Sequence, residues 1–496
     1  MQEELVQLRG ELERIRSERD QLQLKTSELS RSVYELRLVS AERLSSKQSS
    51  TAPSSSISDR NDENIHLELE NLAPEKITHE KAQRFIQDIH DRRTTFNDHD
   101  IRKSLCGSLK HLGSDLYSSP VHFLYELIQN AEDNIYTSTV TPRLRIVVDH
   151  EFILLSNNEQ GLRACDVSAI CSLAVSTKQL DEHIGEKGVG FKSVFAASNQ
   201  PTLISHAWKF AFHVPGRDEM SYITPIWIAD DALLEKIQDR IRSALHDTHL
   251  YLPLKLQAFS SEAEDFLNQL VQAIDPCILI NLRRLERLEI IDERNKQTLI
   301  VTKTMTHIEH NQWQDCITFE GFTFNNLTAS LVQLDSALTQ DTFRVYTANI
   351  QVLATIDHRT RTTTRILLAF PCDPNRDLSY NVYAGLPVCH LGFKFLFNAD
   401  FQLVTNRESI RENIPFNAFL RNHLAALFVY VLLNENDIRK NLNSYYPSRT
   451  NCQIEHLPWW LNMVDRIHEF THKHISILLN IRSGKLGNFF LRIDYC

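Results

Sequence analysis

The spacing of hydrophobic residues divides the chain into segments with different patterns. At the start, apolar residues recur at steps of three, four or seven: Met1, Leu5, Leu8, Leu12, Ile15, Leu22, Leu29, Val33 and Leu36. Glu and Arg crowd the other positions, and Arg19 and Thr26 interrupt the apolar seam. A heptad pattern of this kind predicts a coiled coil over 1–44 and, through it, a homodimer. The alternative for the same pattern is a single solvated helix.

A change in composition follows the heptads. Residues 45–63 are rich in Ser and contain no large apolar residue except Ile57. Because such a segment cannot bury a core, we expect a flexible linker at 45–75 that separates the N-terminal segment from the rest.

After the linker, the hydrophobic period changes between that of helices and that of strands. The pattern predicts helices at 77–92, 261–275 and 419–433. Predicted strands lie at 144–148, 152–155, 203–205, 210–214, 249–254 and 365–370. The first two flank a short polar turn, which indicates a hairpin. Strands dominate 286–405 and helices dominate the C-terminal part, so we expect an α+β fold.

Composition and charge narrow the class of protein. The chain has 496 residues, of which 42% are apolar and 23% charged, as in ordinary globular domains. Its net charge of −10 argues against a nucleic-acid-binding surface over the whole protein. We expect no stretch that is apolar over the length of a bilayer, and no signal peptide at the charged N-terminus. The nine cysteines form no C-x-x-C pair, which favours reduced thiols in the nucleus or cytoplasm and no zinc site.

One predicted helix, at 123–135, carries polar residues at a spacing that suits phosphate chemistry. With a turn of about 100° per residue, Glu126, Asn130 and Asp133 share one stripe. The opposite side is apolar: Leu124, Leu127, Ile128, Ala131 and Ile135. A carboxylate can orient a water for attack on phosphorus, and an amide oxygen is a ligand that Mg²⁺ accepts. The alternative is an ordinary amphipathic helix with a solvated polar face.

A glycine-rich segment further along the chain suits phosphates as well. Gly185-Glu-Lys-Gly-Val-Gly-Phe191 follows Ser176-Thr-Lys178. Glycines at this spacing let backbone N–H groups approach phosphates closely, and Lys187 adds a cation. A helix that begins near Phe191 would point its N-terminus at the same anion. The segment is neither a Walker loop nor a dinucleotide fingerprint, and by itself it is a common turn.

The order of these elements resembles the nucleotide-binding boxes of the gyrase, heat-shock-chaperone, histidine-kinase and MutL (GHKL) superfamily. The segment 123–133 looks like its Asn box, 185–191 looks like its phosphate loop, and Thr248 stands where the superfamily has a late threonine. Within the superfamily, the chain is similar to the plant NO VEIN proteins and their fungal and animal relatives, with sacsin further off. Four segments carry this likeness: Asp115-Leu-Tyr-Ser-Ser-Pro120, Ile128-Gln-Asn-Ala-Glu-Asp-Asn134, Asn157-Asn-Glu-Gln-Gly161 and Ile184-Gly-Glu-Lys-Gly-Val-Gly-Phe-Lys-Ser-Val-Phe195. The likeness is strong over 105–255, thinner to 412 and absent from 1–60.

The resemblance implies a domain order and a set of ligands. It implies a Bergerat-type α/β sandwich at 76–258, with helices on one face of a mainly antiparallel sheet. A transducer-like α+β domain at 259–412 and a helical segment at 413–496 would follow, as part of a longer protein. ATP and Mg²⁺ are the implied ligands, with Asn130 on the metal and Glu126 on the hydrolytic water. The implied nucleotide contacts are Asn130, Asp133, Asn157, Gly161, Lys178, Gly185, Lys187, Gly188, Val189, Gly190, Phe191 and Thr248.

One box departs from the superfamily pattern. Where the superfamily has Asp-x-Gly-x-Gly, this chain has Asn157-x-Glu159-x-Gly161, a form that the NO VEIN group shares. The superfamily aspartate accepts a hydrogen bond from the adenine amino group. The Asn157 side chain can also accept one, without the help of a charge, or it can donate one to a carbonyl. The sequence leaves both options open.

The resemblance also implies a catalytic residue from outside the nucleotide-binding domain. Phe401-Gln-Leu-Val-Thr-Asn-Arg-Glu-Ser-Ile410 resembles the catalytic loop in the middle domain of heat-shock chaperones. Arg407 would then reach the terminal phosphate, like an arginine finger supplied in cis. The alternative is a structural ion pair between Arg407 and Glu408 on a strand-to-helix turn.

These features favour three functions, in descending order. The first is a slow Mg-dependent ATPase that acts as a chaperone-like or conformational switch, with the 185–192 loop closing over the nucleotide. The second is a nucleotide-regulated scaffold, a pseudo-ATPase that binds protein partners. The third is a chromatin or nucleic-acid-associated ATPase, which the acidic balance of the chain disfavours. No membrane partner is expected, and neither a client nor a pathway follows from the sequence.

Overall fold

The computed structural model describes most of the chain from residue 65 onward. The described residues are 65–69, 72–95, 122–172, 190–213, 219–229, 235–244, 248–308, 315–337, 339–353, 356, 362–373, 378–404, 409–448 and 457–474. The coiled coil predicted at 1–44 and the Ser-rich segment 45–63 lie outside them and stay predictions. The predicted linker does not extend to residue 75, because Ile65 and Leu69 are buried in the hydrophobic core. Residues Asn64–Cys496 form one compact unit.

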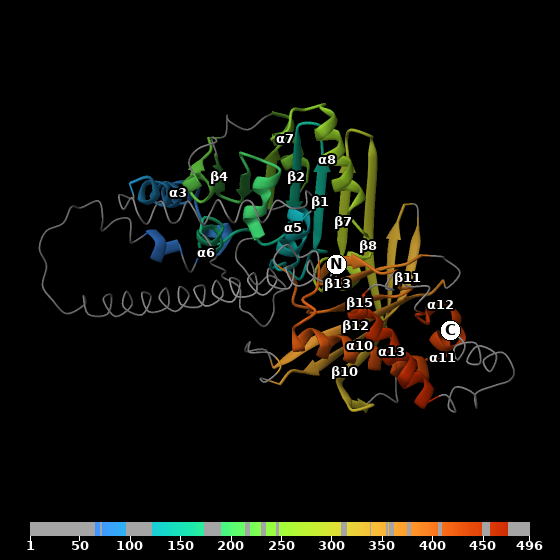
Figure 1. The fold of residues 1–496 in the computed structure, drawn as a ribbon. Coiled ribbons are helices and arrows are strands. Elements are labelled where there is room, and N and C mark those ends of the chain that lie inside the picture. The colour runs from blue at the N-terminus through green and yellow to red at the C-terminus, as the bar shows by residue number, and fades with distance from the viewer. Residues whose placement is uncertain are drawn as a thin grey trace, which may run out of the picture. The chain divides into compact units, whose positions relative to one another are not determined.

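The described strands of this unit join into one mixed sheet (Figure 1). Their order is β14-β13-β15-β12-β11-β10-β8-β7-β1-β2-β6-β3-β4-β5, and β9 pairs with β10 off this path. Neighbours pair antiparallel except β1 with β7 and β13 with β15, which are parallel. The expected mixed α+β class is therefore confirmed at the level of a large mixed sheet with helices.

The strands and helices have the following bounds. The strands are β1 (Arg143–Val148), β2 (Phe152–Asn157), β3 (Thr202–Ser205), β4 (Trp208–Phe212), β5 (Pro225–Trp227), β6 (Thr248–Pro253), β7 (Arg287–Asp292), β8 (Gln297–Ile308), β9 (Cys316–Phe319), β10 (Phe322–Ser336), β11 (Gln340–Gln351), β12 (Thr363–Pro371), β13 (Asn381–Ala384), β14 (Leu386–His390) and β15 (Leu396–Ala399). The helices are α3 (His79–Thr94), α5 (His122–Glu132), α6 (Ala164–Ile170), α7 (Glu235–Ala244), α8 (Ser261–Gln272), α9 (Ile278–Asn281), α10 (Pro415–Asn434), α11 (Asn436–Lys440), α12 (Leu442–Tyr445) and α13 (Pro458–Lys473). Short 3-10 turns are η2 (Pro74–Lys76), η3 (Gly190–Ala196) and η4 (Glu219–Tyr222).

The predicted β1–β2 hairpin is present, and its strands are covered on both faces. Ile153 and Leu155 of β2 belong to the hydrophobic core that contains α5. Phe152 and Leu154 instead pack with Ile237 of α7. Because successive residues of a strand point to opposite faces, α7 covers the face opposite α5. The prediction that the helices cover one face of the sheet is therefore wrong for α7.

Strand β12 is also buried on both faces. Leu367 and Ala369 belong to the core that contains α5, whereas Ile366, Leu368 and Phe370 belong to a second core with α10 and α13. A strand covered on both faces reads as a continuous apolar run rather than an alternation, which explains the sequence at 365–370. The α5 core continues past residue 258 into α8 and β7. The predicted domain boundaries at 258 and 412 stay predictions.

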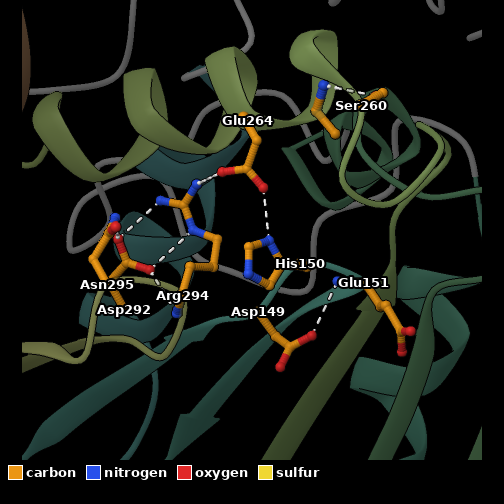
Figure 2. Close-up of polar contacts among 9 residues, drawn as sticks. Asp149, His150, Glu151, Ser260, Glu264, Asp292, Arg294 and Asn295 are labelled. Atoms are coloured by element: carbon orange, nitrogen blue, oxygen red, sulfur yellow. Dashed lines mark hydrogen bonds and ion pairs between the residues drawn. The ribbon is translucent and has the colours of Figure 1, made fainter.

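A charged network fixes the N-terminal turn of α8 (Figure 2). Glu264 accepts a hydrogen bond from Arg294 Nη1 at 2.9 Å, and its other oxygen lies 2.6 Å from His150 Nδ1. Arg294 Nε and Nη2 donate to Asp292, and Asn295 donates to the same carboxylate. Burial opposes the ionisation of Asp292, but these hydrogen bonds outweigh it and lower the pKa of Asp292. The network holds α8 against the β1–β2 and β7–β8 turns.

Helix α10 is apolar along most of its length. By length and composition it could cross a membrane, since an 18-residue window has a mean hydropathy of 1.4. The expectation that no stretch reaches that length is therefore wrong. However, 72% of the window is buried inside the protein, where α10 packs against β12 and α13. A core helix has this property, and one such helix is weak evidence for a membrane span.

Candidate functional site

Helix α5 has the predicted apolar face but ends earlier than predicted. Four predicted face residues are buried, at 7% exposure or less: Leu124, Leu127, Ile128 and Ala131. The helix ends at Glu132, and Ile135 is 53% exposed. Because Ile135 lies beyond the last helical turn, helical spacing no longer sets the direction of its side chain. The assignment of Ile135 to the apolar face is wrong.

The polar stripe of α5 is largely buried. Glu126 of this stripe and Asp133, which directly follows the last residue of α5, are each 5% exposed, and Asn130 is half-buried. A carboxylate withdrawn from water costs free energy unless it has partners, and both Glu126 and Asp133 have partners in the structure. A solvated polar face on an ordinary amphipathic helix therefore does not describe α5.

The end of the glycine-rich segment lies directly over this stripe. A Cβ atom added at Gly190 would be 2.6 Å from Glu126 Oε2 and 3.9 Å from Asn130 Nδ2. Side chains do not approach Cβ atoms as closely as 2.6 Å, so another residue at 190 would displace the carboxylate. Three residues that the sequence assigned to one site, Glu126, Asn130 and Gly190, are therefore neighbours.

Some of the other predicted site residues lie in the described part of the chain and some do not. The following lie outside the described residues: Lys178, Gly185, Lys187, Gly188, Val189 and Arg407. Phe191 is half-buried, and its ring centroid lies 5.8 Å from that of Phe212. The helix expected near 191–195 is the 3-10 turn η3.

Lys192, which the sequence analysis did not single out, anchors η3. Its Nζ donates to the carbonyl oxygens of Ile170 at 2.6 Å and Tyr222 at 2.7 Å. The same atom lies 4.6 Å from the ring centroid of Phe212. Burial lowers the pKa of Lys192 to about 7. The amine thus ties the chain that follows Gly190 to the end of α6 and to η4. In the sequence, this anchoring role is indicated only by the position of Lys192 between Phe191 and Phe195.

Asn157, the last residue of β2, is hydrogen-bonded on one side of its amide. Its Nδ2 donates to the Tyr136 hydroxyl at 2.7 Å, and that hydroxyl donates to Ala131 O at 2.6 Å. Asn157 is 5% exposed, and its Oδ1 is buried without a hydrogen-bond partner among the residues that the structure describes. A buried acceptor without a partner costs about 1–3 kcal/mol. A ligand that donates a hydrogen bond to Oδ1 would remove that cost.

Two more predicted site residues lie near Asn157: Thr248 is its neighbour in the sheet, and Gly161 follows it four residues later in the sequence. The register of β2 and β6 places Thr248 opposite Asn157, and Thr248 Oγ1 lies 2.8 Å from Ser205 Oγ. Gly161 has a φ of +93°, and a Cβ atom there would be 2.1 Å from His206 Cδ2. Both the backbone conformation and the lack of space therefore require glycine at 161.

The C-terminal end of α5 is fixed by Glu132, which the sequence analysis also missed. Its carboxylate accepts hydrogen bonds from the backbone N–H groups of Arg283 at 2.6 Å, Arg284 at 2.9 Å and Leu285 at 2.9 Å. These bonds satisfy a carboxylate that is only 3% exposed. Helix α5 therefore joins the Gly190 region to the chain that enters β7. The partners of Glu132 are backbone groups, which leave no signal in the sequence.

The oxygen atoms that this site offers to a metal suit an ion that binds together with a nucleotide. Within the described residues, no group of three or more His, Cys, Asp or Glu side chains could hold a metal ion. Asn130 offers a single amide oxygen. A Mg²⁺ ion bound there would need phosphate oxygens and water to complete its six ligands. The residues therefore fit a Mg²⁺–nucleotide complex better than a resident metal centre.

Comparisons with known proteins relate the chain to one plant protein. None of the protein-family models matches the chain. The Protein NO VEIN of Arabidopsis thaliana is 27% identical over 339 residues, which are 66% of this chain and 12% of that protein. The chain thus spans a small part of the length of this relative. The B-subunit of the DNA gyrase from Myxococcus xanthus has a TM-score of 0.32 and 10% identity, over 72% of this chain and 99% of that chain. That likeness is too low to establish a shared fold. The sequence comparison shows a resemblance to Protein NO VEIN at 27% identity.

Proposed function

We propose that this chain binds ATP with Mg²⁺ between α5 and the end of β2, and hydrolyses it slowly as a conformational switch. The observation that carries the proposal is the close approach of Gly190 to Glu126, where a Cβ atom would be 2.6 Å from the carboxylate. A glycine, which has no side chain, leaves room beside this carboxylate and amide for a phosphate held by backbone N–H groups. In this proposal, 76–258 is a Bergerat-type ATP-binding domain and 259–412 is transducer-like.

Each residue of the site has a role in this proposal. Asn130 holds Mg²⁺, which neutralises phosphate charge when bound. Glu126 orients the hydrolytic water and accepts its proton, a task that suits a buried carboxylate next to the glycine-rich segment. Asn157 contacts the base. Lys178 from the segment before the glycines, and Arg407 from the second domain, supply positive charge to the phosphates.

A nucleotide-regulated scaffold is the second candidate. The observation that favours it is the neutral amide of Asn157, because a hydrogen bond to a neutral acceptor is weaker than one to a carboxylate. A scaffold would bind ATP with negligible turnover, and its protein partners would respond to the bound state. The homodimer predicted from the N-terminal heptads suits the same role.

Hydrolysis by the full chain separates the two candidates. Glu126→Gln keeps the shape of the side chain and removes the base, so ATP binding should persist while turnover falls by about 10²- to 10⁴-fold. Glu262→Gln, an exposed position on α8, is the matched control and should hydrolyse ATP like the wild type. If the wild type binds ATP but hydrolyses it no faster than Glu126→Gln, the scaffold replaces the enzyme. If the wild type does not bind ATP, both candidates fail.

A further inference from the structure

The hydrogen-bond chain from Ala131 through Tyr136 to Asn157 determines which end of the Asn157 amide remains available. Tyr136 Oη lies 2.6 Å from Ala131 O, and two oxygens come that close only with a proton between them. A carbonyl has no proton to give, so the proton is that of the tyrosine. The hydroxyl then has only lone pairs left for Asn157. The amide atom 2.7 Å from the hydroxyl is therefore the donor, Nδ2.

The opposite rotation of the amide conflicts with the same geometry. With Oδ1 toward Tyr136, one hydroxyl proton would have to serve two oxygens, and one close contact between lone pairs would remain. The hydroxyl does not lose its proton near neutral pH, because burial raises the pKa of Tyr136 well above its ordinary value. Tyr136 therefore holds the amide in one orientation, with one N–H of Nδ2 donated to the tyrosine and with Oδ1 free of any partner among the residues that the structure describes.

We propose that Tyr136 is a positioning residue for nucleotide specificity: it presents Oδ1 of Asn157 to the base and so selects purines with an exocyclic amino group at position 6. The inference rests on the proposed function and adds to it, since it states which base the amide accepts and what fixes that choice. A 6-amino group donates to Oδ1. A 6-carbonyl group places a second acceptor against the first and leaves both unpaired.

The magnitude follows from the buried acceptor. A ligand that leaves a buried polar group unpaired loses more binding free energy than the net gain from one neutral hydrogen bond. We expect the wild type to bind ATP at least about tenfold more tightly than inosine triphosphate, which has a carbonyl at position 6. Purine riboside triphosphate, which has no substituent there, should also bind about tenfold more weakly than ATP.

The test is equilibrium binding of these nucleotides to the full chain in the presence of Mg²⁺. Tyr136→Phe removes the hydroxyl, so the amide can rotate and offer Nδ2 to a carbonyl. The preference for ATP over inosine triphosphate should then shrink to within about threefold. Adding Asn157→Asp to Tyr136→Phe should restore the preference, because a carboxylate accepts hydrogen bonds in either rotation. Tyr125→Phe is the matched control, since it removes a hydroxyl that donates to Ala273 O at 2.5 Å elsewhere on α5.

Each outcome has a distinct meaning. A merely structural role for Tyr136 would weaken both nucleotides alike and leave their ratio at the wild-type value, which would overturn the inference. A wild type that binds ATP and inosine triphosphate equally overturns the inference without any variant, while ATP binding itself stands. A wild type that binds neither nucleotide refutes the proposed function, and the inference with it.

Discussion

Replacing Lys192 with methionine tests whether a buried amine anchors the chain that follows Gly190. Burial lowers the pKa of Lys192 from 10.5 to about 7 in the folded protein. At a pH between these two values, Lys192 is therefore protonated in the unfolded chain and neutral in the folded protein. The free energy of unfolding accordingly rises with pH across that window, by about 1.4 kcal/mol per pH unit for one proton. Below pH 7, the full cost of burying the charge remains.

The magnitude can be worked for an accessible pH range. From pH 7 to pH 9, the titration of Lys192 should raise the free energy of unfolding by about 2–3 kcal/mol, since Lys192 is half-protonated in the folded protein at pH 7. Lys192→Met removes the amine and this slope. Burial also lowers the pKa of Lys303, to about 8, but Lys303 titrates in both proteins and its effect cancels in their difference.

Urea unfolding at pH 7, 8 and 9 provides the assay. The free energy of unfolding of the wild type, minus that of Lys192→Met, should increase by about 2–3 kcal/mol from pH 7 to pH 9. Lys76→Met, which removes an exposed amine, should leave the pH dependence of the wild type unchanged. If the curves of the wild type and Lys192→Met run parallel, Lys192 is not buried against Ile170 and Tyr222 in the way described.

Three further substitutions test the geometry of the site. Gly190→Ala places a methyl group 2.6 Å from Glu126 Oε2, so we expect ATP affinity to fall by about tenfold or more with little change in thermal stability. Glu132→Gln replaces one acceptor oxygen by an NH₂ group that faces backbone donors; the free energy of unfolding in urea should drop by about 2–3 kcal/mol. Gly161→Ala meets His206 Cδ2 at 2.1 Å with a φ of +93°, and should lower stability by about 1–2 kcal/mol or more. Unchanged values would contradict each assignment.

The sequence predicted the parts of the site that depend on local periodicity. Helical spacing placed Glu126 and Asn130 on one stripe, and it placed the buried face of α5 correctly as far as Ala131. It failed at Ile135, because the helix ends at Glu132 and no proline or glycine marks that end. The end of the helix is fixed instead by hydrogen bonds from Glu132 to distant backbone groups.

Other features depend on contacts between residues far apart in sequence. The orientation of the Asn157 amide is set by Tyr136, so the sequence could only leave acceptor and donor roles open. The burial of Lys192 depends on carbonyl oxygens of Ile170 and Tyr222, which belong to two other segments. The sequence also did not predict that α7 packs on Phe152, because a short apolar run does not show whether one or both faces of a strand are buried.

Calorimetric titration of the full chain with ATP, with and without Mg²⁺, measures whether the α5 site binds a metal–nucleotide complex. We expect the wild type to bind ATP and Mg²⁺ to tighten this binding. In Asn130→Ala, most of the Mg²⁺ effect should be lost while weak metal-free binding persists. A wild type that binds no ATP would refute the proposed function, and Mg²⁺-dependent binding that survives Asn130→Ala unchanged would refute the role of Asn130.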